Sequence, residues 1–525
     1  MNYIKVLDTT LRDGGCVNDF NFGSVYMNKI LSALEQSGVD YIELGYIDEA
    51  KGSEQERTQY CNDKVITEYF LKKKKEGIKY VAMVDYGKFD ITKLENRTEN
   101  SIDGIRIAFH KKNWRDVIEI GKTVLEKGYE FFIQPMLTLR YSDNELVELI
   151  DTVNKELPGA TGFYIVDSFG EMRTNDIIRV MHLVDHNLIP GMLLGFHSHN
   201  NLQLSYSNAM ALLEFPTNRK LMLDASVMGM GKGAGNLNTE LLLEHLNLYY
   251  NKQYKIAPLL ELIDQVINVL HKEKYWGYSA EYYLSSINHC TPSYAGYFYN
   301  KHMLSIDQVS ELLGMIAEEK KLSFDKAYAE QLYLEYNASK KSDDSVVVEQ
   351  LKEDLAGKKI LLIAPGKSII NQKEEIQKLL DDKEIISISL NNFEFATDYI
   401  LTTRKEIYEE AIKRGCKIIA PSNIAVSSDN VKVVNYERWI LKDERTHDSS
   451  SVIAFMLLQY ICVAEIKLAG FDGFSININE NYYDNVMRKP VSEEQASRRN
   501  MFYKEFIHKV GRNVKIHFIT PSIYK

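Results

Sequence analysis

The sequence contains little of what disulfide-stabilised, membrane-spanning or nucleic-acid-binding proteins require. Five cysteines occur in 525 residues without a C-x-x-C pair, which argues against a disulfide framework and favours a reducing compartment. No apolar run reaches the ~20 residues of a membrane helix, and no signal-peptide core follows Met1. A net charge of −10 argues against a general nucleic-acid or anionic-membrane surface. We therefore expect a cytoplasmic protein that binds neither nucleic acid nor membrane.

What the sequence does contain is an alternation of short apolar runs with amphipathic stretches. At 525 residues the chain exceeds the ~250–300 residues of a single core, so more than one domain is expected. Continuous rather than alternating hydrophobicity is typical of strands buried on both faces. In the first half, the expected strands are 4–8, 41–45, 80–85, 104–108, 131–136, 162–167, 193–197 and 222–227. Eight such units over residues 1–255 predict an α/β fold, a TIM barrel, with an open doubly wound sheet as the alternative.

Polar residues gather where the first and seventh of these strands are expected to end. Arg12 and Asp13 follow the first run, and His197 and His199 close the seventh. Residues i and i+2 of a strand point to the same side, so both histidines can bind one ion. A carboxylate and two imidazoles suit a divalent metal such as Mn, Co, Zn or Mg. An Arg-Asp pair alone is ordinarily a surface ion pair, but both motifs at strand ends of one barrel indicate an active site.

Three motifs then occur in the order and spacing of a known superfamily. They are Asp8-Thr9-Thr10-Leu11-Arg12-Asp13-Gly14-Gly15, His197-Ser198-His199 and Gly229-Met230-Gly231-Lys232-Gly233-Ala234-Gly235-Asn236. Over about residues 1–300 the chain resembles the DRE-TIM metallolyases, also called HMG-CoA lyase-like. The resemblance implies that Asp13, His197, His199 and Asn236 bind the metal and that Arg12 holds an enolate oxygen. Glu43 would either orient the site or pack at its strand end.

Within this superfamily the 4-hydroxy-2-oxovalerate aldolases look most similar, because a helical extension follows the barrel. We expect residues 256–350 to form that extension, and the resemblance implies a proton-relay role for Tyr278, which could equally be a packing residue. One position departs from the family. The aldolases have a histidine, the base for the substrate hydroxyl, where this chain has Cys16. Cys16 either acts with a lowered pKa or shapes the pocket, in which case His110 or Tyr278 carries the proton.

The β/α rhythm restarts in residues 356–525 and predicts a Rossmann-like domain. The first expected strand begins at residue 359, and the others are 385–390, 399–402, 417–420, 431–434, 465–469 and 515–519. The first runs into a turn at Gly366, Lys367 and Ser368 that offers N–H groups to a phosphate, without Walker A spacing. With Asp472, this turn resembles more distantly the MptE-like pyrophosphokinases, motility accessory factors and sialyltransferase-like proteins. That resemblance implies a nucleotide or nucleotide-sugar ligand, with Ser449–Ser451 as a second anion contact or simply a helix cap.

Together these motifs predict a metal-dependent aldolase, a lyase acting on a carbon–carbon bond. It would join or separate a 2-oxo acid enolate, most simply that of pyruvate, and an aldehyde, with Mn as the metal. By analogy with the second domain, the pathway would be sugar or polysaccharide biosynthesis. The alternatives are a Claisen-type acyl-CoA synthase or lyase, and a transferase or nucleotide-binding regulator acting through residues 356–525. We also expect a homo-oligomer.

Overall fold

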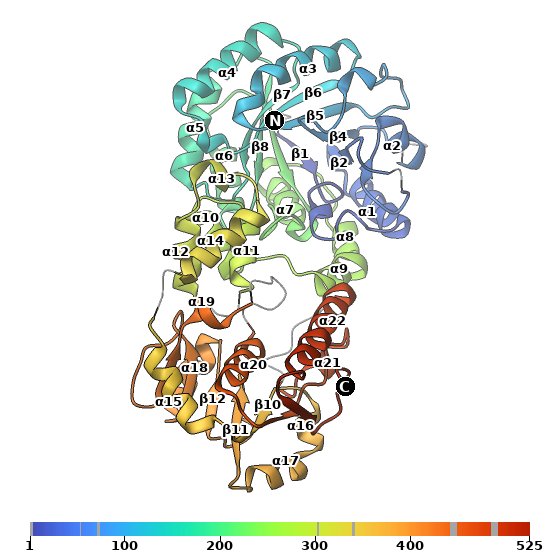
Figure 1. Ribbon diagram of the computed structural model, residues 1–525. Coiled ribbons are helices and arrows are strands. Elements are labelled where there is room, and N and C mark those ends of the chain that lie inside the picture. Colours follow the sequence, from blue (N-terminus) through green and yellow to red (C-terminus); the bar gives the residue numbers. More distant parts are fainter. Residues whose placement is uncertain are drawn as a thin grey trace. The chain divides into compact units, whose positions relative to one another are not determined.

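A computed structural model gives the fold of the chain as two compact units, Met1–Pro292 and Ser293–Lys525 (Figure 1). The residues that it describes are 4–52, 54–70, 74–301, 304–338, 342–441, 449–484 and 492–525. The helical segment expected at 256–350 is therefore divided between the two units. Within the described residues, no helix combines the length and the apolar character needed to cross a membrane.

The first unit is the expected barrel of parallel strands. Its strands are β1 (Ile4–Asp8), β2 (Tyr41–Ile47), β4 (Lys79–Asp85), β5 (Gly104–Phe109), β6 (Glu130–Pro135), β7 (Gly162–Asp167), β8 (Leu193–Ser198) and β9 (Leu221–Ala225). Neighbours pair in the order β1-β9-β8-β7-β6-β5-β4-β2, and pairing of β1 with β2 closes the ring. A two-residue strand that the sequence did not suggest, β3 (Gln59–Tyr60), pairs with the end of β2. The predicted α/β barrel is confirmed.

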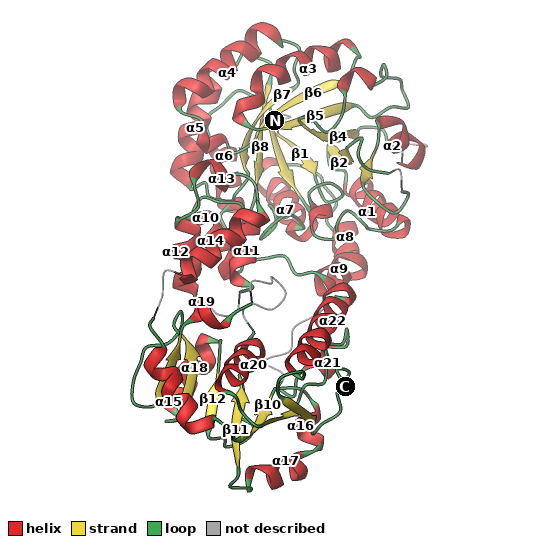
Figure 2. Cartoon of the chain, viewed as in Figure 1, coloured by secondary structure: helices red, strands yellow, loops and turns green. Residues whose placement is uncertain are grey.

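Helices surround these strands, as Figure 2 shows for the first unit. They are α1 (Ser24–Ser37), α2 (Asp63–Phe70), α3 (Trp114–Glu126), α4 (Asp143–Glu156), α5 (Thr174–Asn187), α6 (Ser205–Glu214) and α7 (Thr239–Tyr250). Each buries an apolar face against the outward side chains of the strands, in one continuous core. The N-terminus of helix α4 is fixed by a reciprocal capping box between Ser142 and Glu145.

The inside of the barrel is layered, and the layering positions the site. An apolar cluster lies inside the barrel and consists of Leu7, Tyr41, Val81, Phe132, Tyr164, Val166, Leu193 and Met222. Two residues further along their strands, inward positions become polar, as at Glu43, Gln134 and Asp224, all buried. Charged groups therefore lie above an apolar floor at the carboxyl ends of the strands, where TIM barrels carry their active sites.

After α7, shorter helices continue the first unit: α8 (Ala257–Leu262), α9 (Asn268–Glu273), joined to α8 by a π-helical turn (Ile263–Ile267), and α10 (Ala280–Ile287). Helix α10 is attached to the loop that follows β7. The Ser286 hydroxyl donates to the Phe169 carbonyl at 2.6 Å, and His289 lies 2.6 Å from the Glu171 carboxylate. This part of the extension thus lies at the carboxyl-end side of the barrel.

The second unit contains an open parallel sheet. Its strands are β10 (Lys359–Ile363), β11 (Ile385–Leu390), β12 (Tyr399–Leu401), β13 (Ile418–Pro421), β14 (Val431–Val434), β15 (Glu465–Ala469) and β16 (Lys515–Phe518). They lie in the order β14-β13-β12-β11-β10-β15-β16, and all neighbours pair in parallel. The chain first builds the sheet outward from β10 and then returns to its other side. This order is that of a Rossmann-like domain, as expected.

Helices cover both faces of this sheet. On one face, α15 (Ser345–Leu355), α20 (Ser450–Ile461) and α22 (Glu493–Val510) pack in a large core. On the other, α16 (Ser368–Asn371), α17 (Lys373–Leu380) and α18 (Lys405–Lys413) cover the strands. The remaining helices of the unit are α11 (Pro292–Tyr299), α12 (Ile306–Gly314), α13 (Glu318–Lys321), α14 (Lys326–Ala338), α19 (Tyr436–Trp439) and α21 (Ile478–Asn481).

Candidate metal centre

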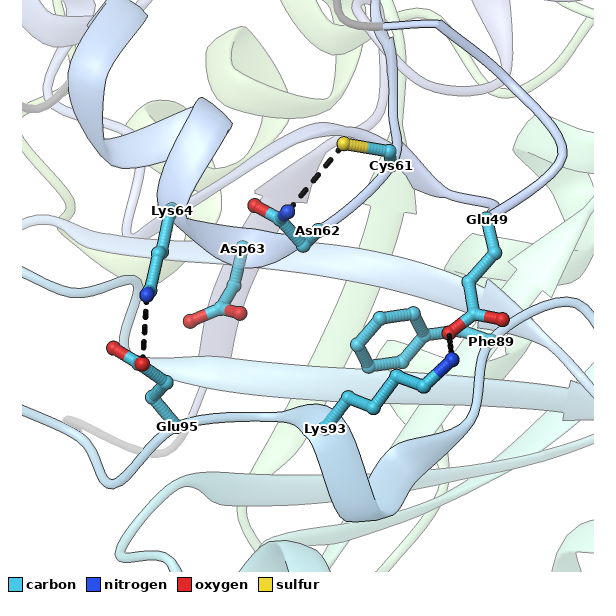
Figure 3. A pocket seen from close by; sticks show the side chains of 8 residues that line it. All are labelled: Glu49, Cys61, Asn62, Asp63, Lys64, Phe89, Lys93 and Glu95. Carbon is cyan, nitrogen blue, oxygen red and sulfur yellow. Dashed lines mark hydrogen bonds and ion pairs between the residues drawn. The ribbon is translucent and has the colours of Figure 1, made fainter.

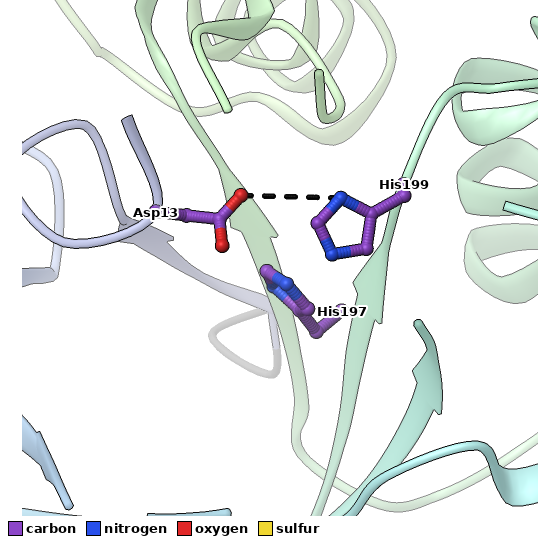
Figure 4. A group of neighbouring side chains, drawn as sticks. All are labelled: Asp13, His197 and His199. Atoms are coloured by element: carbon purple, nitrogen blue, oxygen red, sulfur yellow. Dashed lines mark ion pairs between the residues drawn. The ribbon is translucent and has the colours of Figure 1, made fainter. Parts of the chain in front are cut away.

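Three side chains predicted from separate motifs converge inside the barrel. Asp13, His197 and His199 are all buried, and their candidate ligand atoms lie within 4.8 Å of one another (Figure 4). Asp13 comes from the turn after β1, and the two histidines come from the end of β8. A carboxylate and two imidazoles at this spacing form a donor set suited to a divalent metal ion.

The turn after β1 is held rigidly, and this fixes Asp13. The backbone N–H groups of Arg12 and Asp13 donate to the Thr9 carbonyl at 3.0 and 2.8 Å. Below the turn, the Asp8 carboxylate accepts from Thr10 N at 2.8 Å and from the Thr239 hydroxyl at 2.6 Å. The sequence D-T-T-L-R-D therefore folds back on itself, so Arg12 and Asp13 point into the barrel.

Each histidine is oriented through its Nδ1 atom. His197 Nδ1 lies 3.0 Å from the Asp224 carboxylate, and His199 Nδ1 lies 3.2 Å from the Lys232 carbonyl. His197, held in this way through Nδ1, presents Nε2 to a metal, and such an outer partner raises the basicity of the ligand. His199 Nδ1 also lies 3.9 Å from Asp13 Oδ2 (Figure 4). The arrangement suits metal ligation better than a purely structural role.

Asn236 supplies a further donor, and its surroundings provide a test of the metal assignment. Its Nδ2 donates to Asp13 Oδ2 at 2.8 Å, whereas its buried Oδ1 has no hydrogen-bond partner among the described residues. An orphaned buried oxygen is costly unless something binds it. A Cβ on Gly231 would lie 2.5 Å from Asn236 Nδ2 and 2.6 Å from Asp13 Oδ2, so glycine keeps this space open. The residues present fit a metal ion.

Arg12 lies beside this set with one nitrogen unused. Its Nε donates to Glu43 at 2.6 Å and its Nη1 to Asp13 at 2.6 Å. The Nη2 atom is buried and makes no hydrogen bond to the described chain. A guanidinium fixed on two sides with a free donor is suited to stabilising a developing oxyanion. Glu43 therefore orients Arg12, one of the two roles expected for it.

The electrostatics keep the ligands in their metal-binding protonation states. Burial alone would raise the pKa of Asp13, but the Arg12 guanidinium and then the two histidines hold that pKa far below its usual value. Burial lowers the pKa of His199 to about 4, against the opposing charge of Asp13. At neutral pH the carboxylate is ionised and His199 is neutral, so neither must lose a proton to bind a metal.

A second buried cation, which the sequence did not single out, links the carboxylate that binds Arg12 to the carboxylate that binds His197. Arg106, on β5, is fully buried; its Nη1 lies 2.8 Å from Glu43, and its Nη2 bonds to the Asp224 carboxylate. In the favoured amide orientation, Gln134 accepts from Arg106 at 2.9 Å. An arginine within an otherwise apolar parallel strand was the signal available, because a fully buried charge must be paired.

The positions considered for proton transfer differ in what they can do. Cys16 is an exposed residue, yet its thiol is desolvated by surrounding atoms, and this effect and then Asp13 raise its pKa to about 12. The thiol is therefore protonated at neutral pH, and we interpret it as a group that shapes the pocket. Burial, and then Lys112 and Lys232, lower the pKa of His110, which is half-buried.

Tyr278 lies in a loop that is attached close to the site, but its side chain is 53% exposed. The neighbouring Trp276 donates from Nε1 to the Met228 carbonyl at 3.0 Å, which attaches the loop to the motif after β9. None of the hydrogen bonds or ion pairs described around Asp13 includes Tyr278. Its proton-relay role stays a prediction.

In the second unit, the structure brings three of the four expected cofactor-binding residues together. Ser368 N donates to Asp472 at 2.8 Å, and the Ser368 hydroxyl also bonds to that carboxylate. A Cβ on Gly366 would lie 2.2 Å from the Gly470 carbonyl, so glycine is needed where these loops meet. Lys367 is exposed. The N–H expected to bind a phosphate is occupied by a carboxylate of the protein itself.

A separate hollow of about 410 Å³ in the first unit contains none of the residues discussed above (Figure 3). Its lysines are paired: Lys64 lies 2.7 Å from Glu95 and Lys93 lies 2.9 Å from Glu49. Exposed pairs of this kind are ordinary features of a solvated surface.

Comparison with known proteins agrees with this geometry. The family model described as HMGL-like matches residues 3–266. A 4-hydroxy-2-oxovalerate aldolase from Geobacillus genomosp. 3 is 31% identical over 249 residues, 46% of this chain and 70% of the relative. A namesake from Roseiflexus castenholzii is 30% identical over 271 residues, 51% of this chain and 78% of the relative. The N-terminal domain of a candidate aldolase from Bacteroides vulgatus has a TM-score of 0.51 at 25% identity, covering 58% of this chain and 99% of that domain.

Proposed function

We propose, from the premise that the chain belongs to the HMGL-like family, that it is a metal-dependent aldolase acting on a 2-oxo acid and an aldehyde. The observation that carries the proposal is the pair of unsatisfied buried atoms facing one set of ligands. Asn236 Oδ1 and Arg12 Nη2 both lack partners in the described chain, beside Asp13, His197 and His199. The free oxygen of Asn236 can bind a cation, and the free nitrogen of Arg12 can donate to an anionic oxygen. A 2-oxo acid chelated to a divalent cation would satisfy both atoms.

A divalent cation held by Asp13, His197, His199 and Asn236 would act as a Lewis acid toward the carboxylate and carbonyl oxygens of a 2-oxo acid. The chain's own groups do the rest. Arg12 Nη2 donates to the oxygen that becomes negative on enolisation, and its geometry is set beforehand by Glu43 and Asp13. Because the guanidinium needs no reorganisation, it favours the enolate over the ketone. Pyruvate is the smallest 2-oxo acid that can form an enolate, and Mn is the metal we propose.

The proposal predicts that the protein, loaded with Mn²⁺, exchanges the methyl protons of pyruvate with deuterium from solvent. Loss of the methyl signal by NMR measures this without knowledge of the aldehyde. Exchange must disappear when the metal is removed by a chelator and return when Mn²⁺ is restored. Metal-loaded protein that leaves pyruvate unchanged while exchanging the α-protons of an acyl-CoA would instead establish the Claisen-type alternative.

For the second unit, we propose binding of a nucleotide or nucleotide-sugar, as in sugar or polysaccharide biosynthesis. Its support is the strand order, because ligands of open parallel sheets bind at the carboxyl ends where the order reverses. That point lies between β10 and β15, where the loops carrying Gly366 and Asp472 meet. Burial raises the pKa of Asp472, and its hydrogen bonds with Ser368 lower that pKa in part. The buried charge of this carboxylate is therefore costly, and a ligand that displaced the carboxylate into solvent would remove that cost.

This second proposal predicts that the full chain binds a nucleotide or nucleotide-sugar with a dissociation constant at or below the millimolar range. Calorimetry with uridine, cytidine and guanosine diphosphates and their sugars measures it. Ser368→Trp, which would fill the turn, is expected to abolish the heat of binding while leaving pyruvate exchange unchanged. The absence of heat with every one of these ligands would contradict the proposal.

A further inference from the structure

An aldol reaction at this site requires a group that exchanges a proton with the hydroxyl of the second substrate. Position 16, where the aldolases have a histidine for this step, carries a thiol in this chain. Tyr46, whose ring lies under the Arg12 guanidinium, has a pKa raised well above its ordinary value by burial and then by Asp85. The proton must therefore be carried by another group at the carboxyl ends of the strands.

Asp85 is the last residue of β4, and the strand alternation places it on the inner face of the barrel. Val81 belongs to the apolar inner layer, so Met83 and Asp85 share its side of the strand. Register agrees, because Met83 lies opposite Arg106, which points inward. Asp85 is therefore one inward position closer to the carboxyl end of the barrel than the level of Arg106, where a substrate would enter.

The Asp85 carboxyl is half-buried and makes no hydrogen bond or ion pair with any described residue. The cations acting on it are first Arg12, then Lys232 and Lys88, and the charge of Asp48 acts against them. Cys16 and Tyr46 also feel its charge. Asp8 and Asp224, on the same barrel, are by contrast held by close partners: Asp8 accepts from Thr10 and Thr239, and one oxygen of Asp224 bonds to Arg106 and His197. An unpaired carboxyl beside the oxyanion-binding guanidinium has the freedom and the position of a proton carrier.

We propose that Asp85 is the acid–base catalyst that exchanges the proton of the aldol hydroxyl, a role that rests on the proposed aldolase function. In cleavage, its carboxylate accepts the hydroxyl proton, the O–H electron pair forms the aldehyde carbonyl, and the adjacent carbon–carbon bond breaks. That bonding pair passes to the 2-oxo acid fragment as the enolate, whose oxygen Arg12 holds. In condensation the same steps run backward, and the protonated Asp85 returns its proton to the new alkoxide. Solvent water supplies the proton that turns the enolate into the released 2-oxo acid and accepts it in the reverse direction, and no oxidant or reductant is needed.

Burial raises the pKa of the Asp85 carboxyl, while the charges of Arg12 and then Lys232 hold it down. A carboxyl with a raised pKa is a stronger base than an exposed aspartate. His110 lies on the neighbouring strand end and is the competing candidate, because its lowered pKa makes it neutral at pH 7.

Pyruvate exchange and aldol condensation, measured separately, distinguish a catalytic role of Asp85 from a structural one. Asp85→Asn should keep pyruvate exchange within about threefold of wild type, since solvent water takes the methyl proton in enolisation while Arg12 and the metal ligands stabilise the enolate. Condensation of pyruvate with acetaldehyde or glyceraldehyde, whichever the wild type uses faster, should fall 10²–10⁴-fold, the range of general acid–base catalysis. Asp85→Glu should recover part of the condensation rate and shift the acidic limb of its pH profile. His110→Gln, the matched control, should lower condensation by less than fivefold.

Three outcomes would overturn the assignment. Condensation that survives Asp85→Asn within fivefold would remove Asp85 from the step. Exchange and condensation that fall together would show a structural effect, and a loss confined to His110→Gln would give the role to that histidine. Wild-type protein that performs neither reaction would refute the proposed function itself, a result that is visible before any variant is made.

Discussion

Replacing Asp13 by asparagine should lower the affinity of the chain for Mn²⁺ at least about 100-fold and reduce pyruvate exchange at least about 1,000-fold. Even outer partners of metal ligands are worth 10–100-fold in affinity or activity, and Asp13 is the one carboxylate in the buried set of described residues. The change also removes the charge that Arg12 Nη1 and Asn236 Nδ2 are bonded to. Titration calorimetry with Mn²⁺ measures the affinity, and NMR measures the exchange.

Three further variants complete this test. His199→Ala should weaken Mn²⁺ to a similar degree, because its imidazole lies within the same 4.8 Å group. Asn236→Ala should weaken it less, since a neutral amide oxygen is the ligand lost. Asp264→Asn, an equivalent change at an exposed position outside the site, should leave both measurements unchanged. Unaltered Mn²⁺ binding in Asp13→Asn would mean that the metal centre lies elsewhere.

The fold was predictable from the sequence because strands buried on both faces are continuous apolar runs. All eight barrel strands were expected within about two residues of their observed ends, and β1 and β7 have the expected bounds. The strand β3 was missed because two residues carry no periodicity. The side chains that come together were also predictable, since Asp13, His197 and His199 each sit where a barrel strand ends.

The features that could not be predicted depend on which residues a side chain contacts in the folded protein. Asp472 was expected to contribute to a ligand site, but from 104 residues away it bonds to the N–H of Ser368. Tyr278 lies in a loop, so no strand or helix period fixes the direction of its side chain. Arg106 lies inside an apolar run, and only the barrel register shows that it points inward.

Replacing Arg106 by methionine is expected to lower the free energy of unfolding by about 3–5 kcal/mol, the cost of leaving buried charges without their partner. Arg106 is fully buried between Glu43 and Asp224, and neither carboxylate has access to water. Methionine fills much of the same volume, so the loss reports charge rather than packing. Urea unfolding followed by circular dichroism measures it.

The same substitution tests whether the two halves of the site are coupled through this cation. Glu43 orients Arg12, and Asp224 orients His197, so Arg106→Met should also weaken Mn²⁺ binding, by the 10–100-fold typical of outer partners. Lys64→Met breaks an ion pair whose two side chains are each 58% exposed and should change the free energy of unfolding by less than about 0.5 kcal/mol. If Arg106→Met were as stable as Lys64→Met, the buried charges would be neutralised by protons instead. In that case the folded state would bind more protons than the unfolded chain at Glu43 and Asp224. The free energy of unfolding would therefore fall steeply as the pH rises through the range in which these carboxyls titrate.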